Sequence, residues 1–74
     1  MRPYAEFLRA AAEQDYEKQR IFAQNDKKMP DVIADEINEL AAEHLGDILL
    51  EDMGDGYAVI EDYAEQVDDL LGRL

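Results

Sequence analysis

Apolar residues recur at helical spacing from the start of the chain. Tyr4, Phe7, Leu8 and Ala11 fall on one face of a helix. Pro3 suits a first helical position, because the backbone N–H that proline lacks has no helical partner there. The pattern continues less regularly from about residue 15 to residue 24, and no Gly or Pro interrupts it. Residues 4–24 are therefore predicted to be helical, as either one helix or two.

The strongest helical pattern follows at residues 30–45. Pro30 opens this segment, and Gly46 is predicted to end it in the left-handed conformation that glycine adopts easily. An apolar stripe runs along it at spacings of three and four: Ile33, Ile37, Leu40, Ala41, His44 and Leu45. His44 is interpreted as a helix-end residue, because an imidazole interacts favourably with the helix dipole there.

A β-hairpin is predicted after this helix. Two short apolar runs, beginning at Asp47 and at Tyr57, flank the four residues Met-Gly-Asp-Gly at positions 53–56. Such runs around a glycine-rich connection are typical of two antiparallel strands. We expect Gly56 to adopt a positive φ in this turn.

Helical spacing then resumes to the end of the chain. Asp62 and Glu65 fit a variant of the capping box, so we expect Asp62 to cap a C-terminal helix. The apolar stripe of this helix contains Tyr63, Val67, Leu70, Leu71 and Leu74. The predicted fold is a mostly α, α+β domain with three N-terminal helices, a two-stranded antiparallel hairpin and a C-terminal helix. We expect all 74 residues to belong to one small domain.

This element order is that of a winged helix, but the charges oppose DNA binding. Residues 1–28 carry six Lys or Arg and five acids, whereas residues 29–74 carry only Arg73 against fourteen acids. The third helix and the hairpin would face DNA with carboxylates alone, which repel phosphate. We expect no direct nucleic-acid binding, and we expect the cations of residues 1–28 to pair with the acidic part.

Composition also restricts chemistry and location. The chain has no Ser, Thr or Cys, which excludes triad-type covalent catalysis, disulfides and thiolate metal sites. We expect a protein that is not an enzyme and has no cofactor. No apolar run approaches the roughly 20 residues of a membrane span, and the N-terminus lacks a secretory signal pattern. We therefore predict a cytoplasmic location without membrane insertion.

The dense carboxylates are the candidate functional residues. We predict a partner-binding acidic surface formed by Asp35, Glu39 and Glu43 of the third helix with Glu51, Asp52 and Asp55 of the hairpin. A calcium loop with Gly56 as its glycine fails, because Met53 would have to be a ligand. A looser cation site formed by Glu51, Asp52 and Asp55 remains an alternative, as does an acidic mimic of nucleic acid.

The block from Met29 to Tyr63 resembles the TerB-C domain. The resemblance rests on the Met-Pro start of a helix, Ile37-Asn38, the GDILLED run from Gly46 and the spaced residues from Tyr57 to Tyr63. TerB-C domains lie at the C-terminus of larger bacterial proteins that are linked to TerB-type tellurite resistance and often carry helicase-like or ATPase regions.

The resemblance implies an accessory domain rather than a catalyst. Its setting would be a bacterial stress, tellurite-resistance or phage-defence protein, with this chain as a C-terminal fragment. Its partner would be another protein, the rest of the parent chain or a second copy. The resemblance also implies a structural role for Asn38, whose side-chain amide would bond to the hairpin backbone.

Overall fold

The computed structural model describes residues 4–73, which form four α-helices and one antiparallel strand pair. The order is α1 (Ala5–Ala12), α2 (Tyr16–Asn25), α3 (Pro30–Leu45), β1 (Leu50–Asp52), β2 (Tyr57–Val59), the 3-10 turn η2 (Glu61–Tyr63) and α4 (Ala64–Gly72). This order and the mostly α, α+β class are as predicted. The predictions for Pro3 and Leu74 lie outside the described residues.

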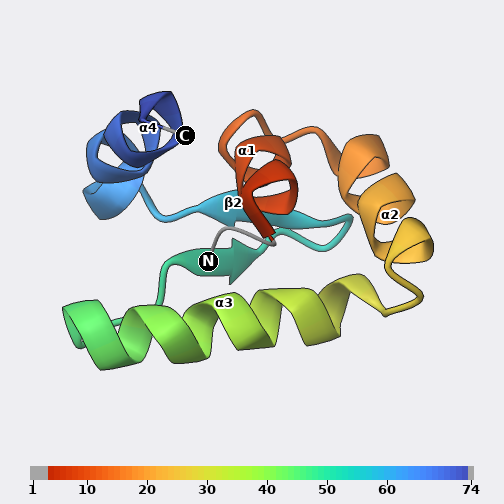
Figure 1. The fold of residues 1–74 in the computed structure, drawn as a ribbon, viewed down its shortest axis with the longest axis horizontal. Coiled ribbons are helices and arrows are strands. Elements are labelled where there is room, and N and C mark those ends of the chain that lie inside the picture. The colour runs from red at the N-terminus through yellow and green to blue at the C-terminus, as the bar shows by residue number, and fades with distance from the viewer. Residues whose placement is uncertain (1–3, 74) are drawn as a thin grey trace.

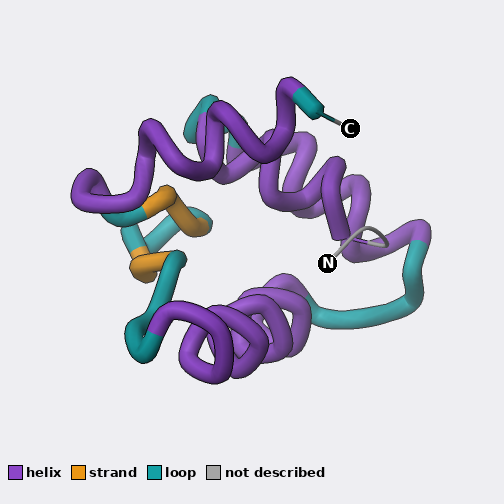
Figure 2. Tube along the Cα trace, turned by 60° about the vertical axis from the view of Figure 1, so that its left-hand side comes forward, coloured by secondary structure: helices purple, strands orange, loops and turns teal. Residues whose placement is uncertain are grey.

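The hairpin lies between two groups of helices. Figure 1 shows α3 along one side of the strands, with α1, α2 and α4 on the other side, and Figure 2 shows the same separation from a second direction. The largest fully buried side chains come from α1, α2, α3 and β1 (Phe7, Leu8, Gln19, Ile33, Ile37 and Leu50). A single core therefore joins both helix groups through the hairpin. Across residues 4–73, no helix combines the length and the apolar character that a membrane span needs.

Residues 4–24 form two helices rather than one. The chain turns at Gln14, which has a φ of 54°. Asp15 then caps α2, because its Oδ1 accepts a hydrogen bond from the Lys18 N–H at 3.1 Å. Asp15 could be recognised as a cap from the sequence, but the positive φ at a non-glycine residue could not. The predicted boundaries of α3 are confirmed, and Gly46 ends it with a φ of 75°.

Asn38 of α3 holds the outer edge of β1. The Leu49 and Leu50 N–H groups donate to Asn38 Oδ1 at 2.9 and 2.8 Å, and Asn38 Nδ2 donates to the Leu50 carbonyl at 3.2 Å. These are the bonds to the hairpin backbone that the family resemblance implied. The polar backbone of a buried strand edge is thereby paired without a third strand.

Gln19 of α2 does the same for β2. The Tyr57 N–H donates to Gln19 Oε1 at 2.9 Å, and Gln19 Nε2 donates to the Tyr57 carbonyl at 2.9 Å. Gln19 is only 1% exposed, and its Nε2 also reaches the Ala10 carbonyl of α1 at 3.4 Å. One buried amide therefore links α1, α2 and β2.

The hairpin loop has the predicted length, but the prediction for Gly56 was wrong. The connection runs from Met53 to Gly56, and the Met53 N–H donates to the Gly56 carbonyl at 2.8 Å. The glycine with positive φ in this loop is Gly54, at 94°. Gly56 is needed for space instead, because a Cβ there would lie 2.6 Å from Cδ1 of Tyr16.

The predicted cap of the C-terminal helix was also wrong. Asp62 lies inside the 3-10 turn Glu61–Tyr63, and α4 begins after it, at Ala64, with no side-chain cap. The extended residue that precedes this turn is Ile60, with φ −60° and ψ 132°. A capping residue needs such an extended backbone. Asp62 cannot cap from within the turn.

The space requirement at position 56 can be separated from backbone strain. We expect Gly56→Ala to lower the free energy of unfolding by about 1–3 kcal/mol, because it overpacks the Tyr16 ring. In a Tyr16→Ala background this cost should fall but not vanish, because the Cβ would still lie 3.0 Å from Gln19 Oε1; urea denaturation in a double-mutant cycle measures the change. Gly54→Ala is the control: its cost comes from the φ of 94° and should not change with Tyr16. Equal coupling of both glycines to Tyr16 would refute this explanation.

The amide of Asn38 should matter more than its volume. We expect Asn38→Ala and Asn38→Leu each to lower the free energy of unfolding by about 2 kcal/mol, because both leave buried N–H groups unpaired. Asn25→Ala, at the exposed end of α2, should change the free energy far less. A fully stable Asn38→Leu variant, measured by urea denaturation, would show that the edge bonds contribute little.

Candidate functional site

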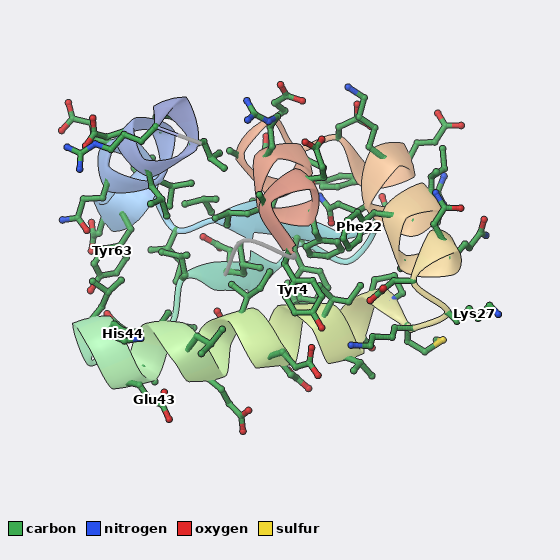
Figure 3. All side chains as sticks on the ribbon, viewed as in Figure 1. Tyr4, Phe22, Lys27, Glu43, His44 and Tyr63 are labelled. Atoms are coloured by element: carbon green, nitrogen blue, oxygen red, sulfur yellow. The ribbon has the colours of Figure 1, made fainter. Side chains whose placement is uncertain are left out.

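Three of the predicted partner-binding residues form a ridge on α3. Asp35, Glu39 and Glu43 are spaced four residues apart and are all exposed. Residues at this spacing lie above one another on a single helix face. Figure 3 shows Glu43 pointing away from the rest of the molecule. We call these three residues the acidic ridge.

The three hairpin residues are exposed but divide between two faces. Asp52 stands opposite Tyr57 in the strand register, and Glu51 stands opposite Ala58. Successive strand residues point to opposite faces, so Glu51 and Asp52 diverge. Asp52 and Asp55 both line a shallow groove of about 270 Å³ beside Gly54 and Tyr57. The structure therefore groups Asp52 with Asp55 and separates Glu51 from them.

Tyr57 connects the hairpin group with the start of α3. Its hydroxyl donates to Asp31 Oδ1 at 2.6 Å. Burial raises the pKa of the Tyr57 hydroxyl well above its ordinary value, with further contributions from the bond to Asp31 and the charges of Asp52 and Asp35. Sequence reasoning missed Tyr57 and Asp31 as members of this surface. Only the pairing of Tyr57 with Asp52 was deducible, from the hairpin register.

The six predicted residues are not neutralised within residues 4–73. None of them forms an ion pair there. Lys18 pairs instead with Glu13 and Asp15, and Arg73 pairs with Asp69. Lys28 contacts Asp26 and, across to α3, Glu36. The expected pairing between the basic first part and the acidic second part is thus seen in the described residues at Lys28 alone. The acidic ridge and the hairpin carboxylates are thus without an ion-pair partner in the described residues, although Arg20 lines the same groove as Asp52 and Asp55.

Lys28, Tyr4 and Glu36 form the one charged contact that joins these two parts in residues 4–73. The Tyr4 hydroxyl donates to Glu36 Oε2, and Lys28 Nζ lies 2.6 Å from the Tyr4 hydroxyl and 3.5 Å from Glu36 Oε2. The bond from Tyr4 and the charge of Lys28 lower the pKa of Glu36, while the Tyr4 bond raises the pKa of Lys28. The network fixes the start of α1 against α3.

The described residues contain no cluster suited to a metal ion. Across residues 4–73, no three His, Asp or Glu side chains are arranged to hold one. Glu51 also points to the face opposite Asp52. The alternative cation site of Glu51, Asp52 and Asp55 gains no support from this geometry.

An apolar groove between α3 and α4 was not predicted from the sequence. It has a volume of about 300 Å³ and lies beside His44, in the last turn of α3. Its apolar lining consists mainly of Leu40, Leu45, Leu49, Val67 and Leu70. Leu45 is 46% exposed and Leu70 is 41% exposed. The predicted stripes of the two helices contained these residues, but nothing in the sequence showed that the stripes leave a gap between them.

The lowered pKa of Glu36 predicts how the Tyr4 network depends on pH. A carboxylate whose folded pKa is depressed stabilises the fold above its ordinary value of 4.5 and loses this effect as pH falls through the folded pKa. We therefore expect Glu36→Gln to melt below wild type near pH 7, and the difference to close as pH falls below 4.5 and through the lowered pKa of Glu36. Glu39→Gln makes the same change at an exposed residue of α3 and should melt close to wild type near pH 7. A difference that widens in acid would contradict the assignment.

The comparisons with known proteins extend the resemblance seen in residues 29–63. The family model described as the TerB-C domain matches residues 2–68 of the 74-residue chain. Neither the curated proteins nor the solved structures provided a match. The family match includes α1, α2, the hairpin and the first part of α4. Because it covers most of the chain, the chain belongs to the TerB-C domain family.

Proposed function

We propose that this TerB-C domain is a non-enzymatic accessory domain that binds a basic protein partner through its acidic surface. The surface comprises the acidic ridge together with the hairpin carboxylates Glu51, Asp52 and Asp55. The family match supports a role in bacterial proteins related to tellurite resistance, and we extend this to stress response and phage defence. The partner is either a separate protein or another part of the parent chain.

One observation carries this proposal: all six carboxylates are exposed, and none forms an ion pair within residues 4–73. Exposed charges of one sign contribute little to the stability of a fold and tend to repel one another. They do steer an oppositely charged partner and raise its association rate. Binding of a protein with a basic surface would use the negative field of these carboxylates directly.

The titratable groups also support a binding role rather than catalysis. The described groups with shifted pKa values are Lys28, Glu36, Tyr57 and Tyr63. Burial is the largest cause for Tyr57, and the other three shifts are due mainly to hydrogen bonds between residues distant in sequence, such as that of the Tyr63 hydroxyl to Asp47 at 3.1 Å. A catalytic acid or base is instead tuned towards the pH at which it works.

Mimicry of nucleic acid is the second candidate, because of the regularity of the acidic ridge. Its carboxylates recur at every fourth residue of one helix, which places successive charges about 6 Å apart along the axis. A protein with a phosphate-binding groove is one kind of basic partner that such a row fits. This candidate differs from the main proposal only in the kind of partner surface.

The acidic ridge can be tested by charge reversal. We expect Asp35→Lys/Glu39→Lys/Glu43→Lys to slow association with a partner purified on the wild-type domain by at least about tenfold, because steering depends on the local field. The wild-type association rate should also fall steeply as salt rises. Lys is as good a helix former as Glu, so α3 should stay intact. Stopped-flow fluorescence measures the rate, and circular dichroism checks the fold.

A matched control separates the position of the charges from their number. Glu61→Lys/Asp62→Lys/Asp68→Lys makes the same charge change at exposed residues of η2 and α4. This variant should keep most of the association rate. If both triple variants slow association equally, the rate depends on the net charge of the domain and not on the position of the acidic ridge. Micromolar, salt-sensitive binding of labelled duplex DNA by wild type would contradict the proposal and implicate the cations of residues 1–28.

A further inference from the structure

We infer that the groove between α3 and α4 is the docking site for an amphipathic helix of the partner, with apolar residues on one face and Lys or Arg on its flanks. This inference rests on the proposed function and specifies where the partner is held and what form it takes. The acidic ridge attracts the partner, whereas this groove supplies apolar contact.

The groove exposes large apolar side chains that the core does not cover. Leu45, in the last turn of α3, and Leu70, on α4, both line it, and they are 46% and 41% exposed. Leu40 and Val67 continue the lining inwards. Exposed apolar side chains that gather in one concave place mark an interaction site more often than singly scattered ones do.

A helix suits this site better than an added strand. The groove is walled by two helices, and grooves of this kind accept the apolar face of a third helix at spacings of three and four residues. Strand addition needs unpaired backbone groups at a sheet edge. Here the backbone N–H of Leu50 in β1 already donates to Asn38, and the backbone N–H of Tyr57 in β2 already donates to Gln19. Each strand is only three residues long.

The charged residues beside the groove are mostly acidic, which favours a basic occupant. Glu43 lies three residues after Leu40 on α3, and Asp69 lies three residues after Gln66 on α4, so each borders a groove residue on its helix surface. Among residues 29–73, Arg73 is the only Lys or Arg, and its guanidinium is held by Asp69 at 2.9 Å. Arg73 itself lies three residues after the groove residue Leu70, so the α4 wall presents the Asp69–Arg73 pair, and Glu43 is the carboxylate beside the α3 wall that a flanking cation would meet.

The same charges oppose a second copy of the chain as the occupant. The whole chain carries a net charge of −12, and residues 29–74, which include both groove walls, carry a net charge of −13. Docking of two such surfaces would bring like charges together at the rim, which is unfavourable at low salt. A basic partner gains from the contact that a second copy would lose.

The test uses two peptides with the same composition. One is a Leu/Lys peptide of about 18 residues whose leucines fall on a single helix face, and the other spreads the same leucines over every face. Each is titrated into the isotope-labelled domain and followed by amide chemical shifts. We expect the amphipathic peptide to shift the second half of α3 and α4, and to bind at least about tenfold more tightly than the other peptide.

Substitutions then locate the contact. Leu45→Gln/Leu70→Gln should weaken binding of the amphipathic peptide by at least about tenfold, because it removes two apolar contacts without adding charge. Ile21→Gln is the matched control, since Ile21 is 49% exposed on α2, outside the groove. It should leave binding unchanged. Thermal melting of each variant shows whether it remains folded.

The outcomes distinguish failure of this inference from failure of the proposed function. Equal binding of both peptides, with shifts confined to the acidic ridge and the hairpin, would overturn the groove as the docking site and leave the acidic surface standing. No binding of either peptide at low salt would overturn both. Shifts of the groove residues that grow with protein concentration alone would make a second copy the occupant and overturn the inference. Unchanged binding by Leu45→Gln/Leu70→Gln would also overturn it.

Discussion

Two side-chain amides pair the edges of the hairpin, and the arrangement of the helices depends on them. A two-stranded hairpin has two open edges and is marginal by itself in water. Asn38 bonds the N–H and carbonyl of Leu50 on one edge, and Gln19 bonds the same groups of Tyr57 on the other edge. Each amide thus takes the place of a peptide group in a neighbouring strand. In residues 4–73, no buried side-chain polar atom is left without a hydrogen-bond partner.

These bonds also determine which way α3 faces. Asn38 turns one side of the helix to β1, and Ile33 and Ile37 turn towards the core. The positions that remain for solvent include Asp35 and Glu39 of the acidic ridge. The exposure of these carboxylates is therefore a consequence of packing. The Asn38 amide and the two buried isoleucines fix the orientation of α3, and so they also fix which of its residues face solvent.

Much of the fold could be predicted from the sequence because it depends on local chemistry. Pro30 and Gly46 mark the ends of α3 through proline's fixed φ and glycine's freedom, and helical periodicity requires no knowledge of distant residues. The length of the hairpin loop follows in the same way. The role of Asn38 came from the family resemblance, since an asparagine in a helix does not by itself show what its amide binds.

The wrong and missing predictions all depend on contacts between distant residues or on competing local structures. Gly56 is needed because Tyr16, forty positions away, lies against it. Asp62 has the chemistry of a cap, but the chain forms a 3-10 turn there instead. Tyr57 meets Asp31 across twenty-six positions. The groove exists only through the relative placement of α3 and α4, which periodicity leaves undetermined.

The acidic ridge and the groove lie on different sides of α3, which gives them separable roles in the proposed complex. Charges at an exposed ridge act over about a Debye length, roughly 8–10 Å at ordinary salt, and so affect mainly the rate of encounter. Apolar contacts in a groove act only after docking and affect mainly the rate of dissociation. Glu43, the last residue of the ridge, is exposed and is followed directly by His44, which lines the groove. A partner drawn to the ridge would therefore already be adjacent to the groove, because one helix carries both.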